Sequence, residues 1–463
     1  MQTKKRNKRH NLDTVEEKVS VNKQPRRGAI EIVPEFKAPE NRIPKKGVDN
    51  GVPAADALNP GKVRWTPKEF IEEAKKVVHP FDGPVKLAPN TVGALQFMAQ
   101  VEPSELVRHR RTSIEWYERR KAELEETETK LHASLPADIE KVVAEKSILL
   151  LKGMLDDIAY DDMPVVYLLT LGTKIIGLLS RTGIWKPQDQ SPQCSAGSVL
   201  AGAEFAKSRL RTKKVRKAED SMIIEAVWKA TEEEIQMGVL EGPFTEEEVN
   251  ASMGSKAWVP ARRFGITQGT KIRPIDDFSE HGHNSAFGSE EKISMKSLDT
   301  IVATAMAWLS SVDGSGRYNF TDTAGRASSG WLHHEWGPKK WLDLVGRVAD
   351  LKSAYKQLPA HPAHKCFNVI AAMNTDGEWQ FFRALSLMFG EAAAVYAFLR
   401  ISRALAAIAT TSFKLAVVEF LDDFTQIETI ETSGSAQQTL EQMLKLLGWK
   451  LSEGDKRLPF SKD

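Results

Sequence analysis

The apolar segment Leu415–Leu421 runs directly into two adjacent aspartates, Asp422 and Asp423. Six of the seven residues in this segment are apolar, and the apolar residues Phe424 and Ile427 follow the pair. Apolar runs on both sides of a polar pair indicate a tight hairpin whose strands are buried and whose tip carries both carboxylates. Two ionised carboxylates side by side repel each other, and a bound divalent cation removes that cost. Oxygen ligands of this kind suit Mg²⁺ or Mn²⁺.

An aspartate doublet alone is weak evidence, because the chain contains three more: Asp156–Asp157, Asp161–Asp162 and Asp276–Asp277. A metal site also needs a ligand from elsewhere, and Asp350 ends the apolar part of a short strand predicted at "LVGRVADL". A carboxylate at a strand end is well placed to face a cleft. The alternative is that Asp350 only caps the helix-like turn after it. Two metals held by such carboxylates activate a 3′-hydroxyl and stabilise a leaving pyrophosphate.

Three regions of different character divide the 463 residues. Residues 1 to 63 are rich in Lys, Arg, Pro and Asn without an apolar period, which predicts a disordered basic tail. Residues 64 to 229 have helical apolar spacing and predict a mainly helical region, whose role the sequence does not show. Residues 230 to 463 alternate strands and helices without a regular βαβ rhythm, which favours an α+β fold.

Local signals place several elements in the last region. Thr231 with Glu234, and Thr245 with Glu248, have the spacing of capping boxes and predict two helix starts. The segment "WVPARRFGITQGTKIRPIDDF" predicts two strands joined at "TQGTK". The segment Asp313–Lys340 has the composition of a long loop.

The composition says more about the cellular compartment of the protein than about its activity. The net charge of +2 does not by itself indicate a nucleic-acid binder. No secretory signal is visible, and Cys194 and Cys366 lie far apart without metal or disulfide spacing. The most apolar window, Pro164–Ser180, contains Lys174 and is shorter than the ~20 residues of a membrane span, so we expect a buried helix or hairpin. We expect an intracellular protein of the cytoplasm or nucleus, not secreted and without a membrane partner.

Six segments, in order, resemble the fingers and palm of a retroelement reverse transcriptase. The resemblance covers the chain from Glu233 to Phe460. The segments are "EEEIQMGVLEGPF", "KIRPIDDFSEHGHN", "ADLKSAYKQLP", "LSLMFGEAAAVYAF", "FLDDF" and "LLGWKLSEGDKRLPF". Six matches in the family's order are far stronger evidence than any one of them. The resemblance implies a right-hand polymerase fold with an antiparallel palm sheet.

The family's metal ligands carry over to four residues. The resemblance implies that Asp350, Asp422 and Asp423 are catalytic and hold two Mg²⁺ (or Mn²⁺) ions. The backbone carbonyl of Leu351 would be a further oxygen ligand.

The resemblance also implies contacts with the incoming nucleotide and the nucleic acid. Tyr355 matches the bulky residue that blocks a ribose 2′-hydroxyl and so favours deoxynucleotides; ordinary core packing is the alternative. Arg262 and Arg263 lie on the predicted hairpin and would assist nucleic-acid binding; a solvated hairpin is the alternative. The implied nucleotide-binding residues are Lys271, Arg273, Ala354, Tyr355, Phe389, Gly390 and Lys456.

The resemblance implies an RNA-directed DNA polymerase that extends a DNA primer on an RNA template with dNTPs. A viral-type RNA polymerase usually has a second carboxylate at the position of Tyr355. The sequence departs from the family at Val395, where a proline is common, and at Pro274, which removes a backbone donor. It stops at Asp463, before the family's thumb, so we expect extension only when a thumb is supplied. The alternative is an inactive retroelement remnant that acts as a nucleic-acid-binding or interaction protein.

Overall fold

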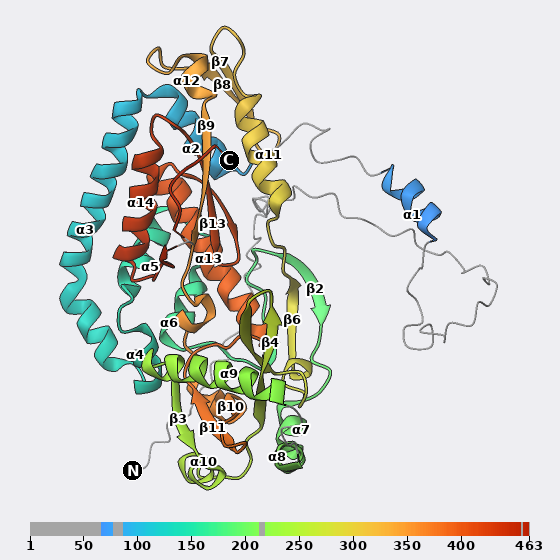
Figure 1. The fold of residues 1–463 in the computed structure, drawn as a ribbon. Helices are drawn as coiled ribbons and strands as arrows, with labels where there is room; N and C mark the ends of the chain where they lie inside the picture. The colour runs from blue at the N-terminus through green and yellow to red at the C-terminus, as the bar shows by residue number, and fades with distance from the viewer. Residues whose placement is uncertain (1–65, 77–86, 213–217, 455–456, 463) are drawn as a thin grey trace, which may run out of the picture.

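The computed structural model describes residues 66–76, 87–212, 218–454 and 457–462 (Figure 1). The predicted N-terminal tail, residues 1 to 63, lies outside the described residues. The described chain mixes helices with several small sheets, which confirms the α+β class predicted from the sequence.

The helices and strands have the following bounds. The α-helices are α1 (Pro67–Ala74), α2 (Pro89–Gln100), α3 (Pro103–Ser134), α4 (Ala137–Val143), α5 (Ile148–Asp157), α6 (Tyr167–Thr170), α7 (Ala196–Ala201), α8 (Ala203–Thr212), α9 (Ala218–Gln236), α10 (Glu246–Met253), α11 (Leu298–Leu309), α12 (Gly337–Trp341), α13 (Ala392–Phe413) and α14 (Ser433–Leu446). The 3₁₀ helices are η2 (Met163–Val166), η3 (Asn284–Ala286), η4 (Ala354–Gln357) and η5 (Pro362–Phe367). The strands are β1 (Gly177–Leu179), β2 (Lys186–Gln190), β3 (Leu240–Phe244), β4 (Pro260–Gln268), β5 (Lys271–Asp277), β6 (Phe287–Lys292), β7 (Arg317–Thr321), β8 (Ala327–Trp331), β9 (Leu344–Asp350), β10 (Val369–Met373), β11 (Trp379–Ala384), β12 (Ala416–Phe420) and β13 (Asp423–Thr429).

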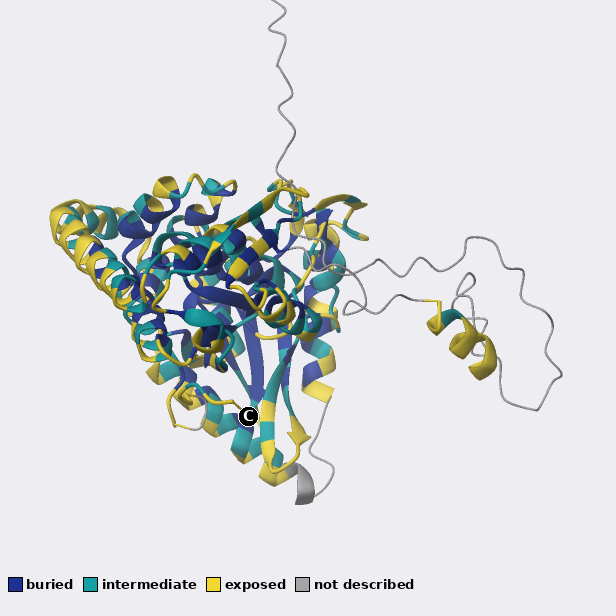
Figure 2. Cartoon of the chain, turned by 90° about the horizontal axis from the view of Figure 1, so that it is seen from above, coloured by how far each residue is buried: buried dark blue, intermediate teal, exposed yellow. Residues whose placement is uncertain are grey.

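A three-stranded antiparallel sheet, in the order β12-β13-β9, lies near the middle of the body. Helices α13 and α14 pack against its strands, and the buried residues gather at the centre of the molecule (Figure 2). Helix α13 is long and apolar enough to cross a membrane, but 72% of its most apolar window is buried inside the protein, as expected of a core helix.

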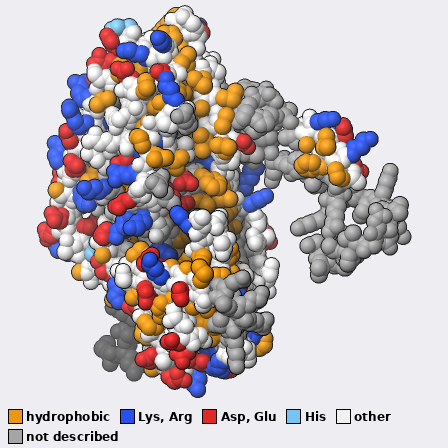
Figure 3. Space-filling view, viewed as in Figure 1, with side chains coloured by type: hydrophobic (Ala, Val, Ile, Leu, Met, Phe, Trp, Pro, Cys, Tyr) orange, Lys and Arg blue, Asp and Glu red, His pale blue; other side chains and the backbone are white. Residues whose placement is uncertain are grey.

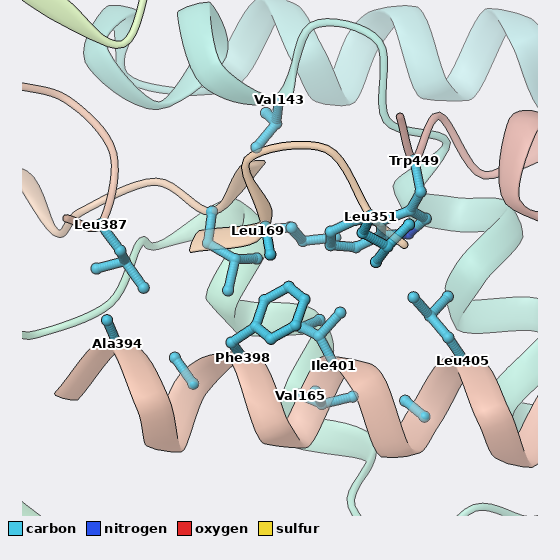
Figure 4. Packing of buried hydrophobic residues seen from close by; sticks show 14 of the residues in the cluster. Val143, Val165, Leu169, Leu351, Leu387, Ala394, Phe398, Ile401, Leu405 and Trp449 are labelled. Carbon is cyan, nitrogen blue, oxygen red and sulfur yellow. The ribbon is translucent and has the colours of Figure 1, made fainter. Parts of the chain in front are cut away.

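The region predicted as mainly helical packs directly on this sheet and its helices. The 32-residue α3 runs beside α14 and α5, and its outer surface carries mixed basic and acidic side chains (Figures 1 and 3). One hydrophobic cluster joins both parts: Val143 and Leu169 of the helical region lie with Leu351, Phe398 and Trp449 (Figure 4). The helical region therefore shares a core with the rest of the chain.

Buried polar contacts reinforce this packing. Arg110 of α3 is fully buried and forms an ion pair with Glu428 of β13. Its guanidinium also donates to the carbonyl oxygens of Lys414 (2.9 Å) and Phe413 (3.3 Å), at the end of α13. Removing Arg110 would leave the buried Glu428 carboxylate without this counter-charge, so the contact fixes α3 on the sheet.

A second sheet contains the predicted hairpin. Its order is β3-β11-β10-β4-β5, with β4 and β5 antiparallel and β4 parallel to β10. Gly269 in the β4–β5 turn has φ +60°, which glycine adopts at little cost. Helix α9 lies across this sheet: a Cβ on Gly265 would stand 2.5 Å from the Ile223 side chain. The predicted strand pair is confirmed.

Two local predictions were wrong. Thr231 does not start a helix, because α9 continues through it and its hydroxyl donates to the Val227 carbonyl (2.8 Å). The segment Asp313–Lys340 is not a loop, since it contains the β7–β8 hairpin and most of α12. The second capping box, at Thr245, is confirmed. The window Pro164–Ser180 forms most of η2 and all of α6 and β1 rather than one helix or hairpin.

Candidate active site

The β12-β13-β9 sheet brings the three predicted carboxylates to one end. Asp350 is the last residue of β9 and the cross-strand partner of Asp423, the first residue of β13. Such partners have Cα atoms about 4.5–5.5 Å apart and side chains on the same face of the sheet. Asp422 lies in the turn between β12 and β13, where its carbonyl accepts the Leu351 N–H (3.0 Å). The hairpin tip predicted from the sequence therefore lies directly beside Asp350.

The chemistry of this donor set fits a hard cation. Asp350, Asp422 and Asp423 are each partly exposed, so solvent ions reach them. Ser452 donates its hydroxyl to the Asp350 carboxylate and its N–H to the Asp350 carbonyl (2.8 Å). Within the described ranges, no group of three or more His, Cys, Asp or Glu side chains has its donor atoms converged on one point. Three carboxylates nevertheless suit Mg²⁺, and binding requires their side chains to turn toward a shared ion.

Tyr355 lies between this sheet end and the core. It belongs to η4, and its ring packs edge-on against Phe398 of α13, with 5.5 Å between ring centroids. Its second ring neighbour is Phe389, at 6.2 Å. Burial raises the pKa of the Tyr355 hydroxyl, and the negative charge of Asp422 raises it further. Tyr355 is therefore within electrostatic reach of the carboxylates, while the adjacent Ala354 is buried.

The predicted nucleotide-contact residues Phe389 and Gly390 form a loop that is held by β5 and η3. Phe389 is 52% exposed, and its carbonyl accepts the Asp276 N–H (3.3 Å). Gly390 has φ +126°, and a Cβ there would stand 2.0 Å from the Asp276 carbonyl oxygen. Asn284 donates its amide to the Gly390 carbonyl and accepts the Ala392 N–H, both at 2.9 Å. Only glycine fits this close approach, and the hydrogen bonds of Asn284 attach the loop to η3.

Lys271 and Arg273 occupy alternate positions on β5 and therefore the same face of the strand. Both side chains are exposed. They are accessible to an anionic ligand, and their contact with a triphosphate stays a prediction. Lys456, the other predicted phosphate contact, lies outside the described residues.

The prediction for Arg263 was wrong. Its side chain is 1% exposed and forms two hydrogen bonds to the Asp276 carboxylate (2.7 and 3.0 Å) and one to Glu234 (2.8 Å). Burial alone would lower the pKa of Arg263, but the charges of Asp276 and Glu234 together raise it above its ordinary value. Arg263 is an internal ion-pair residue and does not reach nucleic acid. Arg262 points to the other face, where it is half-buried and pairs with Glu280 (2.7 Å).

Sequence reasoning missed two residues that hold the site. Ser452 binds Asp350, and Asn284 bridges the two sides of the Gly390 loop. Ser452 stands in the last of the six matching segments, but nothing in the sequence singles it out as a partner of Asp350. Asn284 was noted as part of a matching segment, but its partner lies 106 residues away and was not predictable from spacing.

Comparison of the sequence with models of known protein families and with characterised proteins finds no match to either.

Proposed function

We propose that this chain forms the fingers and palm of an RNA-directed DNA polymerase, which extends a DNA primer on an RNA template with dNTPs. The observation that carries the proposal is the cross-strand pairing of Asp350 with Asp423, beside Asp422. Tyr355 lies five residues after Asp350 and within reach of Asp422. The resemblance to reverse transcriptases implies a metal site at these three carboxylates, and their proximity supports the proposal.

Each group at the site has a role in this reaction. Asp350, Asp422 and Asp423, with the Leu351 carbonyl, would hold two Mg²⁺ (or Mn²⁺) ions. When bound, these ions supply activation of the primer 3′-hydroxyl and neutralisation of the leaving pyrophosphate. The exposed Arg273 offers a planar guanidinium that suits phosphate oxygens.

The remaining residues select and position the nucleotide. Tyr355 fills the space beside the sugar, where a 2′-hydroxyl would clash. Phe389 offers an exposed aromatic face for packing against the nucleotide, and the fixed geometry of Gly390 sets the position of that face. Positioning of this kind is the main contribution of a protein to phosphoryl transfer.

Primer extension on poly(rA)/oligo(dT) with Mg²⁺ or Mn²⁺ tests the proposal, with the chain alone and with a thumb domain supplied. We expect dTTP incorporation with the thumb, and Asp422→Asn should abolish it. The matched control is Asp156→Asn, which changes an exposed aspartate doublet on α5 and should have no effect.

Extension by Asp422→Asn at the wild-type rate would refute the assignment of the carboxylate pair. If the wild-type chain binds the RNA–DNA hybrid but does not extend the primer in either form, the inactive-remnant alternative holds instead.

A further inference from the structure

We propose that Lys146, in the loop between α4 and α5, is a positioning residue for the Asp350 site. It acts through Gln357 and the segment Gly448–Ser452. The inference rests on the proposed polymerase function and assigns a role to the helical region that the sequence left without one. Lys146 itself touches none of the three carboxylates.

Lys146 is buried, and its amino group has three close partners. The residue is 5% exposed, and its ammonium donates to the Gln357 side-chain carbonyl (2.8 Å) and to the Gly448 backbone carbonyl (2.7 Å). The ammonium also lies 3.8 Å from the centre of the Trp449 ring, a cation–π contact. A buried amino group costs free energy unless it has hydrogen-bond partners. These contacts therefore favour one arrangement of Gln357 and Gly448 around Lys146.

Gln357 is hydrogen-bonded both to the segment that follows Asp350 and to the segment Gly448–Ser452. Its amide donates to the carbonyls of Lys352 (2.8 Å) and Lys450 (3.1 Å), and its carbonyl accepts the Lys450 N–H (3.0 Å). Lys352 follows Asp350 by two residues, and Gln357 follows Tyr355 by two. One buried side chain therefore ties the residues around Asp350 to Lys450.

The segment Gly448–Ser452 then reaches Asp350 directly. Leu451 forms a β-bridge with Leu351, directly after β9, and Ser452 binds both the carboxylate and the carbonyl of Asp350. At its other end the segment packs closely on the α4–α5 loop, because a Cβ on Gly448 would stand 1.9 Å from the Glu145 carbonyl oxygen. The loop containing Glu145 and Lys146 thus sets the position of the segment that orients Asp350.

A purely structural anchor would behave differently, and the chain offers one for comparison. Lys121 of α3 donates to the Leu446 carbonyl (2.9 Å), so it also joins the helical region to α14. That bond ends at the last residue of α14 and does not pass through Gln357. Lys152→Met, at an exposed lysine of α5, serves as a surface control.

The first arm of the test is hydrogen exchange on the folded chain, which needs no catalytic activity. In Lys146→Met we expect about tenfold faster exchange in the peptides covering residues 350–357 and 448–454, as local opening becomes easier. Lys121→Met and Lys152→Met should leave both peptides as in the wild type. Gln357→Met removes the hydrogen bonds of the Gln357 side chain and keeps Lys146, so it should show the same faster exchange as Lys146→Met. If Lys146→Met does not fold, Gln357→Met takes its place in the test.

The second arm is primer extension with a thumb supplied. We expect kcat to fall about 10–100-fold in Lys146→Met, with KM for dTTP within about threefold, because a displaced carboxylate impairs the chemical step more than nucleotide binding. Three results would each overturn the inference. The first is unchanged hydrogen exchange in Lys146→Met, and the second is an unchanged kcat in that variant when the wild type is active. The third is that Lys121→Met changes exchange and kcat as much as Lys146→Met does. An inactive wild type would refute the proposed function, while the exchange arm would still decide whether Lys146 holds the site.

Discussion

The substitution Arg263→Met tests how much the buried ion-pair cluster around Arg263 stabilises the protein. The guanidinium makes four hydrogen bonds to Asp276, Glu234 and Thr231. Asp276 and Glu234 are 3% and 2% exposed, so water cannot replace the lost partner. Glu234 keeps the ammonium of Lys356, whereas Asp276 loses both bonds to the guanidinium.

The expected loss of stability follows from this burial. Breaking a buried ion pair by removing one partner costs about 3–5 kcal/mol, because the other charge stays enclosed. Asp276 also holds the Phe389–Gly390 loop through its backbone, so the disturbance should spread to that loop. Urea denaturation followed by circular dichroism and tryptophan fluorescence measures the change.

The neighbouring residue is the control. Arg262→Met removes an arginine that is 24% exposed from the other face of β4, so solvent can partly replace it and the loss should be smaller than in Arg263→Met. The double variant Arg263→Met with Asp276→Leu should recover part of the loss, since both charges are then removed. Equal destabilisation by Arg262→Met and Arg263→Met would refute the buried ion-pair argument.

Three further predictions concern other sites. Gly390→Ala should destabilise the protein by about 1–3 kcal/mol, because alanine at φ +126° meets the Asp276 carbonyl. Gly434→Ala, with nothing within 4 Å, is its control in the same denaturation assay. Tyr355→Ala should raise ribonucleotide incorporation by about 10–200-fold relative to dNTP, and unchanged discrimination would leave Tyr355 a packing residue. Burial lowers the pKa of Lys146 to about 7 from 10.5, so between these two values the unfolded state binds the extra proton. Over that range the stability of the wild type relative to Lys146→Met should therefore rise with pH by about 1.4 kcal/mol per unit, as pH-dependent denaturation would show.

The elements that the sequence predicted well are those fixed by local pattern. The hairpin around Asp422 follows from apolar runs flanking a polar pair, and the β4–β5 hairpin follows from its turn residues. Helix α3 follows from its helical spacing. In each case the pattern that specifies the element lies within the element itself.

The predictions that were wrong depend on contacts between residues far apart in the sequence. Arg262 and Arg263 are adjacent on a strand, so their side chains must point to opposite faces. The sequence does not reveal which face helix α9 covers, and that packing makes Arg263 internal. Thr231 fails as a helix start for a related reason, because α9 extends through it to supply Glu234 to the same cluster.

The sequence divides into a mainly helical region and a following region of strands and helices, but in the structure the two share one core. Arg110 joins α3 to Glu428 on β13, and Lys146 joins the α4–α5 loop to Gln357 beside Tyr355. Both residues are almost fully buried, and removing Arg110 would leave the Glu428 carboxylate buried without its partner. Arg110 thus attaches the helical region to the strand that begins at Asp423, and Lys146 attaches it to the segment that follows Asp350. The helical region therefore belongs to the same packed body as the strands that carry Asp350 and Asp423.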